Sequence, residues 1–297
     1  MRRILAAVML TALLAPLAAA QTVDEIIAKN VAARGGMQKI KSVSTMRFTG
    51  KMTMGQGMEA PFTMTMKRPN RSRVEFTIQG MTGVQAFDGK HAWAVLPFAG
   101  RKDPEAMSEE DSKQMGDQAD FDGILVDYAA KGNKVELIGK DKFEGTDAYK
   151  LKVTQSSGNT RTIWIDAETF LELGADGKRT MRGTEVEFKS TMSDYKEVGG
   201  LLVAHTMQSQ FQGAHGAMVQ TMAVDKIEFN LPAADSLFDL PAGAKPAAPP
   251  STTAPAAAGT SSAASGTPTA GANPAAAKAD SAKAPVKAAK PAATKKP

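Results

Sequence analysis

Apolar and polar residues alternate strictly between Met46 and Ile78, in three runs separated by short turns. Side chains on a β-strand point to opposite faces with a period of two, so this pattern predicts three strands with one apolar and one polar face. The polar face carries mainly threonine, lysine and arginine. The apolar face is built largely from methionine and phenylalanine: Met46, Phe48, Met52, Met54, Phe62, Met64, Met66, Val74, Phe76 and Ile78.

Three segments outside the alternating runs predict helices. Thr22 followed by Glu25 is a capping box, which predicts the start of a helix over residues 22–34. Proline favours the first turn of a helix, so Asp103-Pro104-Glu105 predicts a second helix start, and Ser108 with Asp111 is another possible cap in the same segment. Apolar residues at i, i+3, i+4 and i+7 predict an amphipathic helix over residues 118–131, with the stripe Phe121, Ile124, Leu125 and Tyr128.

From residue 82 to residue 230 short alternating runs recur, and turn sequences separate them. Turns are predicted at Asp88-Gly89, Asp176-Gly177, Gly199-Gly200 and His215-Gly216. Strands joined by tight turns pair with their neighbours along the chain, which predicts an antiparallel meander. The expected fold is therefore mainly β: a single curved antiparallel sheet, or incomplete β-barrel, of about eleven strands with helices lidding its concave face.

Methionine is the informative residue on the predicted apolar face. Its side chain is unbranched and polarizable and adapts to changing partners, whereas a rigid core is more often built from valine, isoleucine and leucine. The face therefore predicts a cavity for a flexible acyl chain, lined by the ten residues above and by Leu125. Ordinary core packing in a methionine-rich sheet is the alternative interpretation.

Both ends of the chain differ in composition from its middle. Two arginines, a short apolar segment and an A-x-A site predict a cleavable signal peptide over residues 1–20, and hence a periplasmic protein. Residues 242–297 contain almost no large apolar side chains, which predicts a disordered tail rich in alanine, proline and lysine. The domain between them, residues 21–241, contains no cysteine and must be stabilised by its core alone.

The net charge is distributed unevenly along the chain. The whole chain carries +5, the tail +6 and the signal peptide +2, so residues 21–241 carry −3. The basic balance thus belongs to the tail, which argues against nucleic acid as a partner of the domain. We expect the lysines of the tail to contact anionic lipid or the cell wall.

No catalytic, metal-binding or cofactor-binding pattern appears in the sequence. None of His91, His205 and His215 has a metal-type partner at i+2 or i+4, and no serine stands in a G-x-S-x-G elbow. The acidic residues between 103 and 111 match a helix N-terminus, where carboxylates complement the helix dipole. The sequence therefore predicts a protein that is not an enzyme and uses no cofactor or metal.

Several short motifs follow one another in a recognisable order. They are Gly35-Gly36 after the first helix, Phe87-Asp88-Gly89-Lys90 before Trp93, Val135-Glu136-Leu137-Ile138-Gly139 before Tyr149-Lys150-Leu151, Ile165-Asp166, and Ile227-Glu228-Phe229-Asn230 before Ser236-Leu237-Phe238. In these features the chain resembles the LolA-like family of outer-membrane lipoprotein-sorting proteins, from about residue 22 to residue 241.

The resemblance implies an incomplete antiparallel barrel in which helices lid a hydrophobic cavity for acyl chains. It also implies acylated lipoproteins or lipids as cargo, an inner-membrane ABC exporter as donor and an outer-membrane acceptor. The family's best-known carriers hold the lid with an arginine inside the cavity. Here Arg47 lies near the corresponding strand, but on the polar face.

Three functions are compatible with this pattern. The first is a periplasmic carrier that shields acyl chains during transfer toward the outer membrane. The second is an envelope regulator that senses lipids or lipoproteins on the same scaffold, and the third is a structural envelope protein whose sheet is filled by its own side chains. Hydrocarbon gains about 0.8 kcal/mol per CH₂ when it leaves water, and shielding it requires no catalytic residue, so the carrier is the leading hypothesis.

Overall fold

The computed structural model describes residues 21–247 apart from residues 56, 182–183 and 214–215. The predicted signal peptide, His215 and the tail beyond residue 247 lie outside the described residues. Within the described ranges, no helix is long and apolar enough to cross a membrane.

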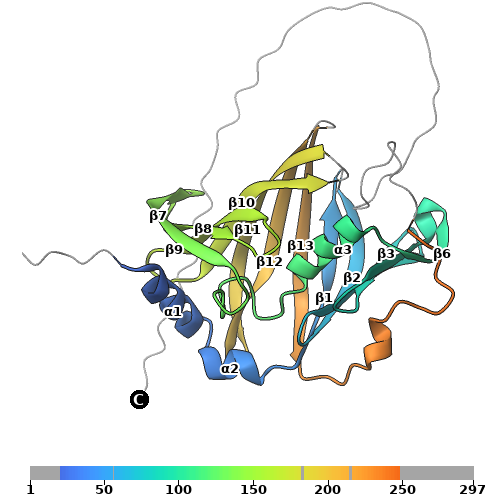
Figure 1. Cartoon of the computed structure of the whole chain (residues 1–297), viewed down its shortest axis with the longest axis horizontal. Helices are drawn as coiled ribbons and strands as arrows, with labels where there is room; N and C mark the ends of the chain where they lie inside the picture. Colours follow the sequence, from blue (N-terminus) through green and yellow to red (C-terminus); the bar gives the residue numbers. More distant parts are fainter. Residues whose placement is uncertain (1–20, 56, 182–183, 214–215, 248–297) are drawn as a thin grey trace, which may run out of the picture. The chain divides into compact units, whose positions relative to one another are not determined.

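One antiparallel sheet of thirteen strands dominates the fold (Figure 1). Strands pair in the order β6-β5-β4-β3-β2-β1-β13-β12-β11-β10-β9-β8-β7, so the first and last strands of the chain meet in the middle of the sheet. The predicted curved antiparallel sheet is confirmed, with thirteen strands in place of about eleven. The strands are β1 (Thr45–Met54), β2 (Met58–Lys67), β3 (Arg71–Ile78), β4 (Met81–Phe87), β5 (Ala92–Leu96), β6 (Arg101–Ala106), β7 (Lys134–Phe143), β8 (Thr146–Thr154), β9 (Thr160–Asp166), β10 (Glu172–Met181), β11 (Thr184–Val198), β12 (Leu201–Gly213) and β13 (Gly216–Phe229).

The described residues also contain three α-helices and two short 3₁₀-helices. The capping box before the first helix is confirmed, because the Glu25 N–H donates to Thr22 Oγ1 at 3.2 Å and the Thr22 N–H donates to Glu25 Oε2 at 3.0 Å. The helices are α1 (Val23–Ala33), α2 (Met37–Ser42), α3 (Glu109–Gln118), η1 (Pro97–Ala99) and η2 (Asp235–Leu237).

Two glycines allow close approach of neighbouring strands where the sheet bends. A Cβ atom on Gly50 would lie 2.0 Å from the Ala223 carbonyl oxygen, where the register between β1 and β13 shifts. A Cβ atom on Gly174 would lie 2.0 Å from the Ser190 carbonyl oxygen, beside a register shift between β9 and β10. Bulges of this kind increase the local bend and twist, so they contribute to the curvature of the sheet.

The core lies on the apolar, concave face of the sheet in two main clusters. In the first, Ile26 of α1 and Ile40 of α2 pack against strand residues that include Leu151 and Ile165; we call it the lid cluster. The second contains Phe62 and other residues of β1, β2, β3 and β5, and we call it the β1–β5 cluster. One smaller cluster extends the core toward α3. Another, which contains Trp164, lies on the opposite face of β8 and β9, because Trp164 stands between Ile163 and Ile165 of the lid cluster.

The predicted helix over residues 118–131 is wrong. The α3 helix ends at Gln118, and residues 119–133 form a series of turns, which we call the lid loop. Gly123 (φ +88°) and Asp127 (φ +52°) adopt left-handed conformations that a right-handed helix excludes. The apolar stripe is still buried, because Phe121 and Leu125 belong to the lid cluster. The concave face is thus covered by α1, α2, α3 and a loop.

Two further local predictions are wrong for a common reason. Asp103-Pro104-Glu105 lies in β6, where it pairs with β5, and does not start a helix; the alternative cap is confirmed, because the Asp111 N–H donates to Ser108 Oγ at 3.0 Å at the start of α3. Asp176-Gly177 lies inside β10, which pairs with both β9 and β11, and does not form a turn. Pairing with neighbouring strands overrides these local turn and helix signals.

After β13 the chain runs along the polar face of the sheet toward β6 (Figure 1). Thr45 Oγ1 donates to the Leu231 carbonyl oxygen at 2.7 Å, and Trp93 Nε1 donates to the Phe238 carbonyl oxygen at 2.8 Å. Lys245 then forms a parallel bridge with Glu105 of β6. We call residues 231–245 the C-terminal strap. The first residues of the predicted tail therefore contact the edge of the sheet.

Candidate functional site

The concave face carries all eleven residues that were predicted to line an acyl-chain cavity. Ten lie on β1, β2 and β3, where the strand register places them on one face, and the lid loop adds Leu125. Five of them are between 2% and 7% exposed in the β1–β5 cluster: Met52, Met54, Phe62, Phe76 and Ile78. In this part of the face the predicted residues pack against one another and are shielded from solvent.

The other six predicted residues lie closer to the helices. Met66 and Leu125 are buried in the lid cluster, and Met46 packs against it. Val74 packs against the β1–β5 cluster. Phe48 and Met64 are half-buried and pack against both clusters, so they join the two parts of the core.

The strand register extends the methionine face across strands that are distant in sequence. Met52 of β1 lies opposite Met222 of β13, which lies opposite Met207 of β12, which lies opposite Met192 of β11. Antiparallel partners point to the same face, so these four residues form one methionine row on the concave side. Met52 is 7% exposed, whereas Met207 is 37% exposed.

A second apolar row runs parallel to the methionine row, nearer the free ends of the strands. Phe188 of β11 lies opposite Phe211 of β12, which lies opposite Met218 of β13, and all three are half-buried. We define the open end of the concave face by six residues from the two rows: Phe188, Met192, Met207, Phe211, Met218 and Met222.

None of the open-end residues was predicted as part of the site. The sequence of each of β11, β12 and β13 does show one apolar face, because apolar residues recur at every second or fourth position. Their register with Met52 depends on the pairing of β1 with β13, which joins segments about 170 residues apart. Local alternation identifies a face of one strand, and only the pairing shows which residues of other strands continue it.

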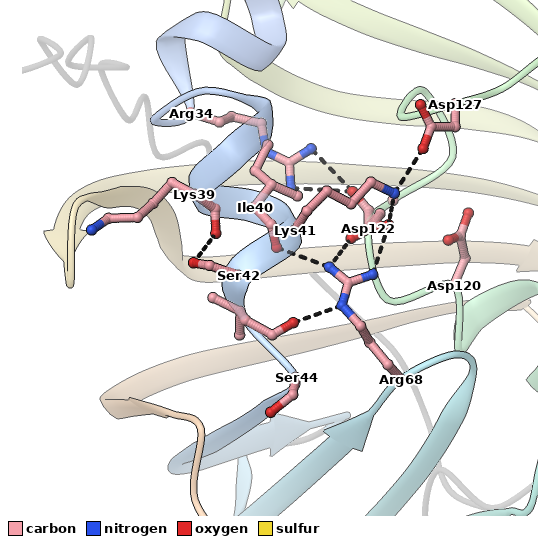
Figure 2. A network of polar contacts seen from close by, with 12 residues as sticks. Arg34, Lys39, Ile40, Lys41, Ser42, Ser44, Arg68, Asp120, Asp122 and Asp127 are labelled. Atoms are coloured by element: carbon pink, nitrogen blue, oxygen red, sulfur yellow. Dashed lines mark hydrogen bonds and ion pairs between the residues drawn. The ribbon is translucent and has the colours of Figure 1, made fainter.

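A network of charged groups around Asp122 holds the lid loop (Figure 2). Arg68, which follows β2, donates to both carboxylate oxygens of Asp122, at 2.8 Å and 2.5 Å. Lys41 of α2 donates to the same carboxylate at 2.5 Å and forms a second ion pair with Asp127 at 2.7 Å. Arg34, at the end of α1, donates to the Asp122 carbonyl oxygen at 3.3 Å. Three cations from different elements therefore converge on one lid-loop residue.

The charge of Asp122 is stabilised although its side chain is only 6% exposed. Burial raises the pKa of the Asp122 carboxyl, but hydrogen bonds from Arg68 and Lys41 outweigh burial, so its pKa lies below the ordinary value of 3.8. The hydrogen bonds to Asp122 and Asp127 raise the pKa of Lys41. A bidentate arginine–carboxylate pair is among the stronger polar contacts in proteins. The network therefore remains charged at neutral pH.

A second titratable group lies on the concave side, beside the lid cluster. Glu172 of β10 is half-buried opposite Ile165, and the Tyr195 hydroxyl donates to the Glu172 carbonyl oxygen at 2.7 Å. Burial raises the pKa of the Glu172 carboxyl to about 7, although Arg34 and Arg161 act in the opposite direction. Burial, together with the charge of Glu172, raises the pKa of Tyr195. Nothing in the local sequence around Glu172 indicated this environment.

The described residues offer apolar surface and no recognisable reaction centre. No group of three or more histidine, aspartate or glutamate residues within them is placed to hold a metal ion. His205 is buried with Nδ1 3.0 Å from the Val203 carbonyl oxygen, and His91 is exposed beside Asp88.

Solved structures with a similar fold include proteins from three bacteria. A DUF1329 family protein from Desulfovibrio piger matches with a TM-score of 0.50 at 14% identity, over 73% of this chain and 97% of that chain. An outer membrane lipoprotein-sorting protein domain from Vibrio parahaemolyticus matches with a TM-score of 0.48 at 15% identity, over 72% and 95%. A LolA superfamily protein from Nitrosomonas europaea matches with a TM-score of 0.49 at 14% identity, over 74% and 98%.

No protein-family model and no curated protein matches this sequence. At 14% identity, the Desulfovibrio protein shares its fold with this chain, and the match covers nearly the whole Desulfovibrio chain. The resemblance predicted from the sequence therefore holds as a likeness of fold, and a likeness of fold does not by itself establish function.

Proposed function

We propose that the protein is a periplasmic carrier that shields acyl chains of lipoproteins or other lipids during transfer toward the outer membrane. The observation that carries this proposal is the open end, where methionine and phenylalanine side chains share one face and remain partly accessible to solvent. A set of apolar side chains that share one face and stay partly exposed is typical of a binding site for an apolar partner. In this role the cargo comes from an inner-membrane ABC exporter and passes to an outer-membrane acceptor.

The energetics of hydrocarbon support a carrier without catalytic residues. Burying a sixteen-carbon chain gains on the order of 12 kcal/mol at about 0.8 kcal/mol per CH₂, so the chain needs cover to cross an aqueous compartment. Transfer of this kind breaks no covalent bond. We therefore propose that the protein is not an enzyme.

The open end and the β1–β5 cluster have complementary roles in this proposal. Met207 and Met222 offer the first contact, and the methionine row leads from them to Met52. Methionine repacks with little strain, so buried members of the row are able to move aside for an entering chain. The acyl chain then extends from the open end toward the β1–β5 cluster.

Two measurements test the carrier. Mass spectrometry of organic extracts from natively purified protein should detect bound lipid. A fluorescent fatty-acid probe should bind the wild type and should bind Met207→Asp at least about tenfold more weakly, because an unpaired carboxylate disfavours hydrocarbon beside it. The matched control is Ile138→Asp, which changes another exposed apolar residue, 55% exposed on β7 at the far edge of the sheet, and should leave probe affinity within about twofold.

The burial of the predicted residues on β1, β2 and β3 favours the structural alternative for that part of the face. In that alternative the sheet is filled by its own side chains and takes no ligand. Absence of lipid in the extracts, together with no probe binding by the wild type, would reject the carrier. Equal loss of affinity in Met207→Asp and Ile138→Asp would place the probe away from the open end.

A further inference from the structure

A hollow of about 550 Å³ lies on the polar face of the sheet, opposite the concave side. Its lining comes from β13, β1, β2 and β3, with Leu237 of the C-terminal strap at its rim. The strap is held across this face by Arg73, which donates to the Leu237 carbonyl oxygen at 2.9 Å. Strand side chains and strap together therefore build a pocket that the proposed carrier function does not use.

Most of the charged side chains in this pocket are paired with one another. Arg73 pairs with Glu75 at 2.6 Å, and Lys226 pairs with Glu228 at 2.7 Å. Arg47 is the exception: it is half-buried, and among the described residues its guanidinium has no hydrogen-bond, ion-pair or aromatic partner. The pocket thus contains one uncompensated positive charge.

The strand register places Arg47 between Thr65 of β2 and Glu228 of β13, and the Glu228 carboxylate is paired with Lys226. Thr65 lies directly opposite Arg47 on β2, and Thr49 and Thr63 lie opposite one another in the next row on the same face. A guanidinium presents five N–H donors in a planar fork that matches a phosphate or carboxylate, and each threonine hydroxyl adds another donor. A partly desolvated arginine without an acceptor is costly, and a bound anion would remove that cost.

We propose that this pocket binds an oxyanion, a phosphate group above all, with Arg47 as its principal contact. Leu237 is 38% exposed at the rim, so the anion can carry an apolar substituent. The shared chemistry is a phosphate, whether free in solution or in the headgroup of a phospholipid. The site lies on the face opposite the acyl-chain surface and does not depend on the carrier function.

The test uses the full chain, so that the basic tail is the same in every sample. Binding of inorganic phosphate, glycerol 3-phosphate and dihexanoyl phosphatidylglycerol is measured by calorimetry for the wild type and two variants. Arg47→Gln removes the guanidinium. Lys51→Gln is the matched control, because Lys51 lies on the same strand and the same face, is 63% exposed and removes the same charge outside the pocket.

The wild type should bind at least one of the three ligands. Arg47→Gln should weaken that binding about tenfold or more, and Lys51→Gln should change it less than about twofold. Tighter binding of the phospholipid than of glycerol phosphate, reduced by Leu237→Ser, supports a headgroup as the natural ligand. Equal binding of the two supports a free phosphate.

Stability provides an independent measurement. Without ligand, Arg47→Gln should melt at or above the wild-type temperature, because it removes an unpaired charge. Added phosphate should raise the melting temperature of the wild type and of Lys51→Gln, but not that of Arg47→Gln. Binding of the fatty-acid probe should be equal in all three proteins, which separates this site from the carrier function. Absence of phosphate binding by the wild type, or equal binding by both variants, would overturn the proposal.

Discussion

Two parts of the concave face are built from the same residue types but differ in how deeply their side chains are buried. On β1, β2 and β3, methionine and phenylalanine are buried in the β1–β5 cluster, with Phe62 only 2% exposed. On β11, β12 and β13, the same residue types occupy register-matched positions and are half-buried or exposed, as at Met207. Alternation therefore determines the face on which a residue lies, but not whether other elements cover it.

The difference follows from what packs over each part. The β1–β5 cluster receives Leu96 from β5 and contacts from Phe98 of η1 and Met107 before α3. The lid cluster receives α1, α2 and the lid loop. The part of the chain that the structure describes supplies no comparable set of buried partners to Met192 or Met207. A binding surface and a core can therefore share one sheet face without any change in sequence pattern.

The largest effect is expected from truncating matched phenylalanines in the two parts. Phe62→Ala should lower the free energy of unfolding by about 3–5 kcal/mol, because it leaves a cavity in a buried cluster. Phe211→Ala, at the half-buried open end, should cost about 1 kcal/mol. Urea unfolding of both variants measures the difference. Similar costs would mean that the open end is packed as tightly as the β1–β5 cluster.

Releasing the lid loop should expose the lid cluster and leave the β1–β5 cluster covered. Asp122→Asn leaves Arg68 and Lys41 without their carboxylate and should lower the free energy of unfolding by about 3 kcal/mol. Hydrogen exchange should increase in the lid loop first, while the β1–β5 cluster stays protected. Asp235→Asn, in an exposed pair with Lys67, is the control and should cost much less, because solvent screens an exposed pair.

The Asp122 network also predicts a pH dependence. The Asp122 pKa is lower in the folded than in the unfolded protein, so its contribution is present above about pH 4 and is lost as the pH falls below that value. In Asp122→Asn this acid-induced loss should be smaller than in the wild type. Identical acid unfolding profiles for the two proteins would show that the network does not stabilise the fold.

A pH dependence of the opposite sign is expected at Glu172, beside the lid cluster. Its carboxyl has a pKa of about 7 in the folded protein and 4.5 as its ordinary value, so the folded state retains a proton that the unfolded state releases between these pH values. Wild-type stability should therefore fall as the pH rises from about 4.5 to about 7. Glu172→Gln should remove this slope and be the more stable protein at pH 8. A wild-type slope retained in Glu172→Gln would assign it to another group.

Much of the fold was predictable because its signals are local. The capping box at Thr22 and the alternation from Met46 to Ile78 depend on residues only a few positions apart, and both predictions are confirmed. The prediction for residues 118–131 failed although its apolar spacing was regular. Phe121 and Leu125 are buried as that spacing required, but Asp122 is held by Arg34, Lys41 and Arg68 from three distant elements, and the backbone follows those contacts.

The sequence by itself determined which residues of each strand share a face, where the first helix begins, and that methionine would dominate one surface of the sheet. Only the tertiary structure decided that β1 pairs with β13, that this pairing aligns Met52 with Met222, Met207 and Met192, and that Arg47 lies in a pocket without a partner. The physical reason is distance along the chain. A strand's two faces follow from its own period of two, whereas register, cover and charge pairing depend on segments more than a hundred residues apart.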